Sequence, residues 1–270
     1  MELRLTGKRA LVTGSSIGIG AVIATVLARE GATVAVHGRD EVRTGKVAEA
    51  IVNNGGKAVA VFGDLTDDAA VTSLLRQVDE RTGGVDILVN NAGGSGDKHR
   101  WEETPLEAWS ASFDRNVLAA VRLTNAILPK LRQAGWGRIV NVSSLAGAMP
   151  PATGPDYSAA KAAINNLTLS LSKSAAVDGV TVNSVSPGTI RSEKLEAAFR
   201  RMAGDQGIDA NAPWSDVEQA IMNSGVFNVP AKRVGTTDDV ANAVAYLCSP
   251  LAGYITGVDL RVDGGAMPAL

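Results

Sequence analysis

The sequence is poor in the residue types that build several common kinds of site. Its 270 residues include one cysteine, Cys248, and two histidines. A single cysteine excludes an internal disulfide and a cysteine-cluster metal site, so we predict no bound metal. Basic and acidic residues nearly balance, at 26 against 28, which gives a formal charge of −2. This balance argues against the basic surface that binds nucleic acid or an anionic membrane.

Long apolar runs are also lacking. No stretch approaches the 18 uninterrupted apolar residues typical of a membrane-spanning helix. Residues 1–8 carry charges where a signal peptide needs an apolar run. We therefore expect a soluble cytoplasmic protein. A chain of this length buries a large core without the help of disulfides or a metal.

What the sequence does contain is an alternation of short apolar segments with amphipathic helical ones. The apolar segments predict strands at Arg9–Thr13, Thr33–Val36, Ala58–Phe62, Asp86–Val89, Gly137–Val142, Val180–Val185 and Gly257–Val262. Helical spacing between them predicts helices from about Val22 to Glu30, and over Glu41–Asn54, Asp67–Arg81, Leu106–Leu131, Tyr157–Ala175 and Asp238–Cys248. This order predicts an α/β fold: a single Rossmann-type domain over residues 1–270, with a doubly wound parallel sheet of about seven strands and helices on both faces.

Two places depart from this regular pattern. The helix over Leu106–Leu131 is expected to break near residues 114–116, because Asn116 favours caps and kinks. Glycine and proline interrupt residues 190–230, which predicts a substrate-side flap rather than a second domain. Its three aromatic residues, Phe199, Trp214 and Phe227, either line a mainly apolar pocket or pin the flap to the body.

A glycine-rich turn follows the first strand and opens the first helix, running from Gly14 to Gly20. Backbone amides at such a turn can approach a pyrophosphate at the helix N-terminus. The alternative is a turn that merely joins a strand to a helix. Ligands of doubly wound sheets bind beyond the carboxyl ends of the strands, where Arg39, Asp64 and Asn91 also fall. We therefore favour dinucleotide binding.

Tyr157 and Lys161 lie four residues apart, on one face of a predicted helix. An ammonium beside a phenol favours the phenolate, and lowering a tyrosine pKa from about 10 to about 7 takes roughly 4 kcal/mol. The attraction between two unit charges about 4 Å apart supplies roughly this free energy at an effective dielectric constant near 20. We expect Lys161 to make Tyr157 a usable proton donor or acceptor. The alternative is a packed tyrosine followed by a solvated lysine.

With these segments placed, nearly the whole chain resembles the short-chain dehydrogenase/reductase family, including its 3-oxoacyl-[acyl-carrier-protein] reductase-like members. The resemblance rests on Thr13-Gly14-x-x-x-Gly18-x-Gly20, on Asn90-Asn91-Ala92-Gly93 and on Pro187-Gly188-Thr189. It implies a catalytic tetrad of Asn116, Ser144, Tyr157 and Lys161. It also implies a cofactor site made of Gly14, Ser15, Ser16, Ile17, Gly18, Ile19, Gly20, Gly38, Arg39, Asp64, Leu65, Asn91, Ala92, Gly93, Tyr157, Lys161, Pro187, Gly188 and Thr189.

The mechanism that the resemblance implies assigns one role to each member of the tetrad. Tyr157 protonates a carbonyl oxygen as hydride arrives from the nicotinamide, and Ser144 holds that oxygen. Ser144 is preferred to Ser143 for its spacing to Tyr157. Lys161 lowers the tyrosine pKa and binds the nicotinamide ribose, while Asn116 holds a water that relays protons to Lys161.

We expect NADP(H) to be preferred, with NAD(H) possible as cofactor. Gly38 stands where NAD-preferring relatives carry an acid, and the planar fork of Arg39 suits a 2′-phosphate. Three features oppose this: Asp40 and Glu41 follow, and Ile17 replaces a basic residue found in many NADP-preferring relatives. The alternative is that Arg39 is a solvated arginine that balances those acids.

Three functions follow from the resemblance: an NADP(H)-dependent oxidoreductase of small alcohols or ketones, a 3-oxoacyl-[acyl-carrier-protein] reductase, or a non-enzymatic dinucleotide-binding regulator. The intact tetrad favours an enzyme. Asp178 would repel an acidic carrier protein, although Arg132 lies nearby. The broad apolar stripes of the helices over Leu106–Leu131 and Tyr157–Ala175 predict a homotetramer, since this helix pair meets its symmetry mate in the family.

Overall fold

The computed structural model describes residues 2–97, 99–209 and 211–268. In this part of the chain seven parallel strands form one sheet, in the order β3-β2-β1-β4-β5-β6-β7. The strands are β1 (Arg9–Val12), β2 (Thr33–Gly38), β3 (Lys57–Phe62), β4 (Ile87–Asn90), β5 (Gly137–Val142), β6 (Val180–Pro187) and β7 (Asp259–Val262). The predicted seven-stranded parallel sheet is confirmed.

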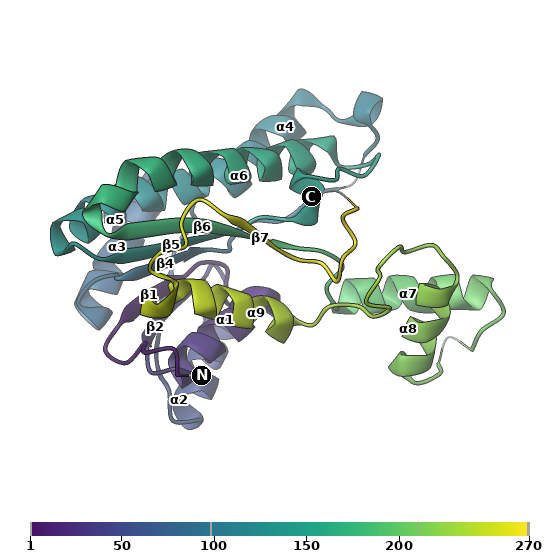
Figure 1. Cartoon of the computed structure of the whole chain (residues 1–270), viewed down its shortest axis with the longest axis horizontal. Helices are drawn as coiled ribbons and strands as arrows, with labels where there is room; N and C mark the ends of the chain where they lie inside the picture. The colour runs from purple at the N-terminus through teal and green to yellow at the C-terminus, as the bar shows by residue number, and fades with distance from the viewer. Residues whose placement is uncertain (1, 98, 210, 269–270) are drawn as a thin grey trace.

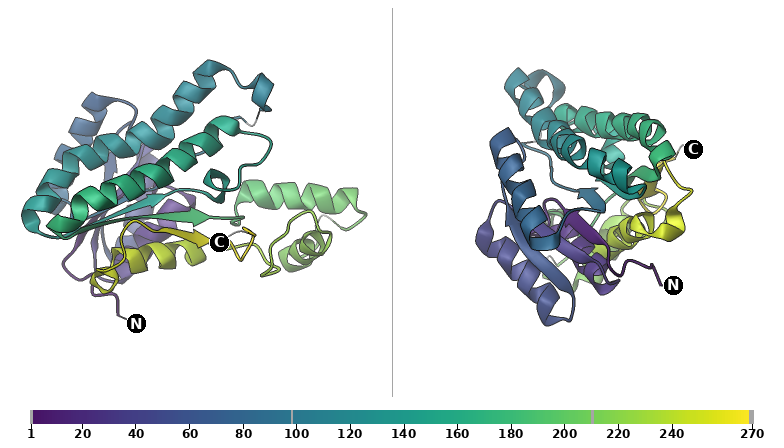
Figure 2. Two further views of the ribbon diagram at one scale, coloured as in Figure 1. Left: turned by 45° about the horizontal axis from the view of Figure 1, so that its top comes forward. Right: turned by 90° about the vertical axis from the view of Figure 1, so that its left-hand side faces the viewer.

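Helices cover both faces of the sheet (Figures 1 and 2). The α-helices of the described residues are α1 (Gly18–Arg29), α2 (Glu41–Asn53), α3 (Asp68–Thr82), α4 (Leu106–Phe113), α5 (Ala119–Ala134), α6 (Pro155–Ala175), α7 (Glu193–Asp205), α8 (Trp214–Asn223) and α9 (Thr237–Cys248), of which α7 and α8 lie away from the sheet. Successive strand residues point to opposite faces. Val12 therefore joins the core beneath α1, α2 and α9, whereas Leu11 joins the core beneath α3 and α5. No helix of the described residues is long and apolar enough to cross a membrane.

The sheet places a crevice above β1 and β4. The chain leaves β1 toward β2 on one side and returns to β4 on the other, so the connections diverge at the carboxyl ends of these two strands. The break expected near residues 114–116 is a π-helical segment, η2 (Asp114–Leu118), between α4 and α5. Such wide turns interrupt α-helices most often at functional sites. Here the segment carries Asn116 toward the crevice side of the sheet.

The segment from residue 190 to residue 230 forms α7 and α8, which project beyond the carboxyl ends of the strands (Figure 1). The ring of Phe199 lies 5.6 Å from that of Trp214 and 5.0 Å from that of Phe227, centroid to centroid. These rings belong to a small apolar cluster shared by α7 and α8. The three rings therefore stabilise the fold of the flap itself.

Candidate active site

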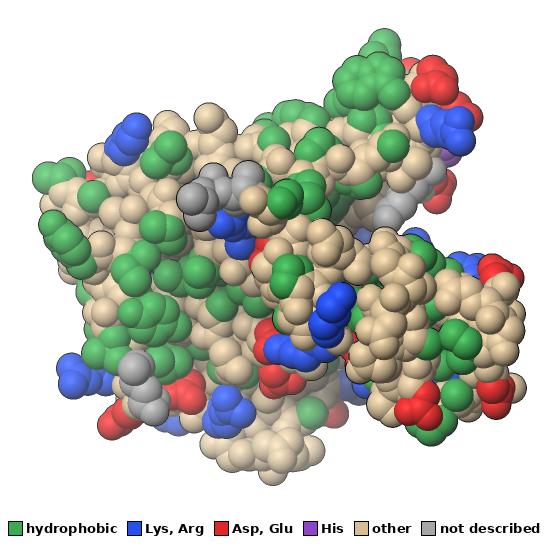
Figure 3. All heavy atoms as spheres, turned by 45° about the vertical axis from the view of Figure 1, so that its right-hand side comes forward, with side chains coloured by type: hydrophobic (Ala, Val, Ile, Leu, Met, Phe, Trp, Pro, Cys, Tyr) green, Lys and Arg blue, Asp and Glu red, His purple; other side chains and the backbone are tan. Residues whose placement is uncertain are grey.

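A cleft of about 980 Å³ opens where the strands end. Figure 3 shows the molecule hollowed between the flap and the segment around α4. The lining brings together most of the predicted site: Gly14, Ile17, Gly18, Ile19, Gly20, Asn91, Ala92, Gly93, Ser144, Tyr157, Lys161, Pro187 and Gly188. The start of the predicted flap, from Ile190 to Lys194, also lines the cleft, as do Arg43, Gly94 and Thr237, which sequence reasoning missed. Thr189 instead lines a smaller neighbouring cavity of about 320 Å³.

Tyr157 and Lys161 lie one turn apart at the start of α6, as predicted. The Lys161 Nζ lies 5.6 Å from the centre of the Tyr157 ring and donates a hydrogen bond of 2.9 Å to the Val142 carbonyl oxygen. The Lys161 residue is only 4% exposed, and this burial lowers its pKa to about 8. Burial likewise raises the pKa of Tyr157, and the hydrogen bond with Ser144 offsets part of that rise.

The pKa of Tyr157 is therefore raised by burial, where the sequence predicted a lowered value. The lysine ammonium is turned toward the carbonyl of Val142, and desolvation of the phenol outweighs any charge effect. A raised pKa keeps the tyrosine hydroxyl protonated at neutral pH. Tyr157 accordingly carries a proton that it can donate.

The two serines after β5 have different surroundings. The Ser143 hydroxyl is buried and donates to the Lys161 carbonyl oxygen at 3.1 Å, which fixes β5 against α6. The Ser144 hydroxyl accepts a hydrogen bond of 3.2 Å from the Ala146 amide and contacts Tyr157. With its lone pair engaged by an amide, Ser144 can point its own proton toward an oxygen in the cleft. The geometry supports the choice of Ser144.

Asn116 is buried and uses its side chain to hold the loop after β4. Its Oδ1 accepts from the Gly94 amide at 2.9 Å, and its Nδ2 donates to the Ser112 carbonyl oxygen at 2.9 Å. A Cβ at Gly93 would collide with this side chain, and Gly93 has a φ of +149°. Asn116 thus positions the loop that borders the cleft beside Lys161. The water relay implied by the family resemblance stays a prediction.

The glycine-rich turn fits a dinucleotide. A Cβ on Gly20 would overlap the Gly14 carbonyl and the Asn91 side chain, so the turn can pack this closely only with glycine. Gly18, with a φ of +58°, has open space where its side chain would be. Within the described residues no side chain caps the N-terminus of α1, which leaves amide donors for a phosphate. The Asn91 Nδ2 secures the turn by donating to the Thr13 and Gly14 carbonyl oxygens at 2.8 and 3.0 Å.

The far end of the cofactor site lies after β2 and β3. A side chain at position 38 would overlap the Thr44 hydroxyl and meet the Ser16 Cβ at 2.9 Å, so this position cannot hold a carboxylate in the present packing. The Arg39 side chain is 76% exposed, and its Nη1 lies 3.5 Å from the Asp64 Oδ2. Such an exposed pair is weak, which leaves the guanidinium free to turn to a ligand. The Leu65 side chain is buried in the core.

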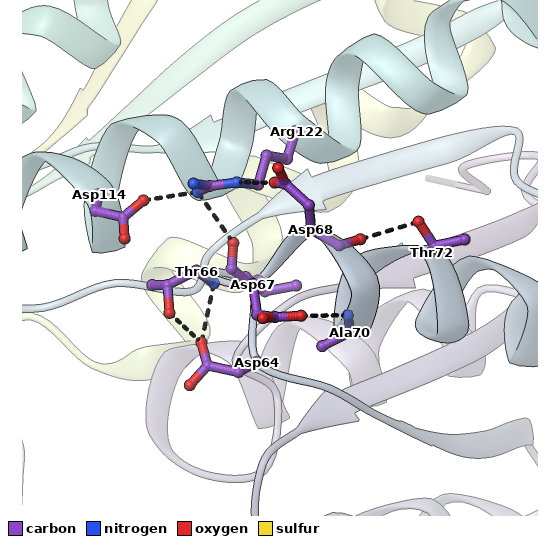
Figure 4. A network of polar contacts seen from close by, with 9 residues as sticks. Asp64, Thr66, Asp67, Asp68, Ala70, Thr72, Asp114 and Arg122 are labelled. Carbon is purple, nitrogen blue, oxygen red and sulfur yellow. Dashed lines mark hydrogen bonds and ion pairs between the residues drawn. The ribbon is translucent and has the colours of Figure 1, made fainter.

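Arg122 lies between Asp68 and Asp114, as Figure 4 shows. On α5, its Nε pairs with Asp68 at 2.6 Å, and its Nη1 pairs with Asp114 at 2.7 Å and reaches the Leu65 carbonyl oxygen at 3.3 Å. Asp114 opens the π-helical segment that carries Asn116. One guanidinium thus fixes the loop after β3 to the segment beside Lys161. Sequence reasoning missed this contact because its partners are distant in the chain.

These features define the class of protein: a Rossmann-type fold with a phosphate-binding turn, and a tyrosine, serine and lysine in one cleft. A family model for short chain dehydrogenase matches residues 8–203. The chain belongs to this family of nicotinamide-dependent oxidoreductases. Within the described residues no group of three or more potential ligand side chains could hold a metal ion.

Several relatives match over nearly their full length. A 3-oxoacyl-[acyl-carrier-protein] reductase, FabG, of Vibrio cholerae is 37% identical over 97% of this chain and 98% of its own. A 7alpha-hydroxysteroid dehydrogenase of Escherichia coli is 30% identical over 100% of this chain and 98% of its own. The crystal structure of L-sorbose reductase from Gluconobacter frateurii, complexed with NADPH and L-sorbose, superposes with a TM-score of 0.90 at 31% identity, covering 100% of both chains.

Proposed function

We propose that the protein is a cytoplasmic, NADP(H)-dependent oxidoreductase that interconverts a small-molecule alcohol and its carbonyl compound, with Tyr157 as the general acid and base. The observation that carries this proposal is the Tyr157 hydroxyl, which hydrogen-bonds Ser144 at the cleft with Lys161 buried behind it. When bound, the nicotinamide supplies or accepts the hydride. The chain supplies the proton, and it positions the carbonyl oxygen among hydrogen-bond donors and charged groups.

Each residue then has a task that its surroundings suit. Tyr157, protonated at neutral pH, donates its proton to the carbonyl oxygen during reduction. Ser144 donates to the same oxygen, where negative charge develops. Lys161 binds the ribose and, with a pKa near 8, can return a proton toward Tyr157. Asn116 holds the loop after β4 and, with it, the water that relays protons to Lys161.

The preference for NADP(H) rests on positions 38 and 39. No carboxylate fits at Gly38 to repel a 2′-phosphate, and Arg39 is exposed beside it. A charge-assisted contact is worth about 1.5–3 kcal/mol. Arg39→Ala should therefore weaken NADPH binding by tenfold or more and leave NADH binding almost unchanged, as measured by the quenching of protein fluorescence. Arg39→Lys, which keeps the charge without the fork, should lose an intermediate amount.

The opposite outcomes are clear-cut. Tighter binding of NADH than of NADPH by the unaltered protein would contradict the preference. An equal loss for both cofactors in Arg39→Ala would mean that the arginine stabilises the loop and does not contact the 2′-phosphate.

Reduction of 3-oxoacyl groups on a carrier protein is the second candidate, favoured by the relatives of 35–37% identity that carry that name. The charges near the carrier-facing helix ends weigh against it. Arg132 Nε lies 3.1 Å from Asp178, and Arg132 also donates to Ser174. The arginine that could attract an acidic carrier is thus already neutralised. A carrier-bound thioester reduced faster than small ketones would reverse this ranking.

We also propose that residues 190–230 close over the substrate. The base of this segment, from Ile190 to Lys194, lines the cleft, while α7 and α8 have an apolar cluster of their own. Such a unit can move as a body about its base. Trypsin cleavage within the segment should slow when NADPH and a substrate are both present. Cleavage at an equal rate in both states would show that the segment is not a lid.

The proposed homotetramer rests on the outer surface of α4, η2 and α6. Leu106, Leu118 and Leu169 are exposed on these elements, which lie in the outer helix layer (Figure 2). Large apolar side chains exposed on outer helices can be covered by a second copy of the chain. Sedimentation at micromolar concentration should give four times the monomer mass of 27.8 kDa. A monomer in that experiment would refute the proposal.

A further inference from the structure

His37 lies in β2 directly beneath the glycine-rich turn and is only 2% exposed. Its Nδ1 is 3.2 Å from the Gly14 amide nitrogen, and its Nε2 is 3.0 Å from the Gly63 carbonyl oxygen. An amide can only donate and a carbonyl can only accept. The imidazole must therefore be neutral, with its proton on Nε2 and a lone pair on Nδ1.

The backbone of the same residue holds the next residue of the turn. The His37 amide donates to the Ser15 hydroxyl at 2.9 Å, and the His37 carbonyl oxygen accepts from the Ser15 amide at 2.8 Å. Gly14 itself has a φ of +60°, and a Cβ there would come within 2.9 Å of the Ala92 backbone. The start of the phosphate-binding turn is thus fixed between His37 below it and the loop after β4 beside it.

We propose that His37 is a positioning residue for the dinucleotide, and that it holds the turn in its binding geometry only while the imidazole is neutral. This inference rests on the proposed dinucleotide binding. A proton on Nδ1 would set N–H against N–H at 3.2 Å, with no solvent to separate them. The Gly14 amide would then lose its acceptor, and either the ring or the turn must shift. Affinity for the pyrophosphate falls as a result.

The pH range follows from the groups that face the ring. Asp64 approaches from the loop after β3 and favours the cation, whereas Arg39, from the end of the same strand, disfavours it. The turn from Gly14 to Gly20 contributes no ionisable side chain. Burial has the largest effect and lowers the pKa of His37. The turn therefore keeps its binding geometry at neutral pH. Affinity for the dinucleotide weakens only below pH 6.5, the ordinary pKa of histidine.

Two substitutions separate the two ring contacts. In His37→Asn the amide oxygen takes the place of Nδ1 and can accept from Gly14. In His37→Gln the amide nitrogen takes the place of Nε2 and can donate to Gly63, but the acceptor for Gly14 is lost. The dissociation constants of NADPH and NADH are measured from pH 5 to pH 8 for the three proteins. Comparing variants at each pH cancels the titration of the cofactor itself.

For the unaltered protein we expect affinity for both cofactors to fall by up to about tenfold more than for His37→Asn between pH 7 and pH 5, since a buried donor loses its partner. His37→Asn should bind like the unaltered protein at pH 7, and His37→Gln should bind about tenfold more weakly at every pH. The same pH dependence in His37→Asn and the unaltered protein would overturn the inference, as would tight binding by His37→Gln. No binding of either cofactor at any pH would instead overturn the proposed function.

Nitrogen NMR of the unaltered protein tests the same point without a substitution. The sequence has two histidines, so the imidazole region is simple to assign. We expect one ring at pH 7 with a protonated Nε2 and an unprotonated Nδ1. A His37 ring that is protonated at Nδ1, or at both nitrogens, would overturn the inference.

Discussion

Tyr157→Phe should lower the turnover number for carbonyl reduction by at least the roughly 10²–10⁴-fold typical of a lost general acid. The substitution removes only the hydroxyl that hydrogen-bonds Ser144, so the turn around Gly14 and its affinity for the cofactor should be unchanged. Steady-state oxidation of NADPH and direct binding measure these two quantities separately. Tyr254→Phe is the matched control, because this tyrosine is fully exposed on the surface.

The pattern of the two measurements is what identifies the role. A loss in turnover with unchanged binding marks an interaction made only in the transition state. Near-normal turnover in Tyr157→Phe would remove Tyr157 from the mechanism. A parallel loss of cofactor binding would mean that the phenol holds the cofactor instead.

Lys161→Met should lose activity and gain stability. The variant keeps the length of the side chain without the ammonium, so the ribose contact and the proton supply to Tyr157 both disappear. We expect turnover to fall by about 10²-fold or more and the dissociation constant of NADPH to rise by about tenfold. In the unaltered protein, the turnover number for carbonyl reduction at saturating NADPH should be constant between pH 6.5 and pH 8 and decline above pH 8, as Lys161 loses its charge.

The stability change follows from the same burial. The pKa of Lys161 falls from 10.5 to about 8 on folding, so the unfolded chain binds more protons between these values and stability rises with pH across that range. At neutral pH the buried ammonium therefore destabilises the native state by up to about 3 kcal/mol. Denaturation of Lys161→Met at pH 7 should show a higher free energy of unfolding. A less stable variant, or a pH profile without a decline above pH 8, would contradict this account.

The fold and most of the cleft could be predicted because their signals are local in the sequence. The apolar segments mark buried parallel strands, and the spacing of Gly14, Gly18 and Gly20 indicates a tight turn before a helix. The four-residue interval from Tyr157 to Lys161 places both on one face of a helix, which the structure bears out.

The remainder depends on contacts between distant segments. The upward shift of the Tyr157 pKa follows from burial of the phenol, which no spacing rule reveals. The clustering of Phe199 with Trp214 required knowledge of how α7 and α8 pack. The links made by Arg122 and His37 join segments up to about 57 residues apart, so neither residue type nor local pattern pointed to them.

Isotope transfer tests the central claim most directly. The protein is mixed with NADPH that carries deuterium at both C4 positions, together with a panel of simple ketones, ketoses, oxosteroids and 3-oxoacyl thioesters, and the products are analysed by mass spectrometry. The account predicts one deuterium on the carbinol carbon of at least one product alcohol. In Tyr157→Phe this alcohol should form about 10²-fold or more slowly. Tight binding of NADPH with no deuterium transferred to any carbonyl compound of the panel would contradict it and favour a dinucleotide-binding regulator.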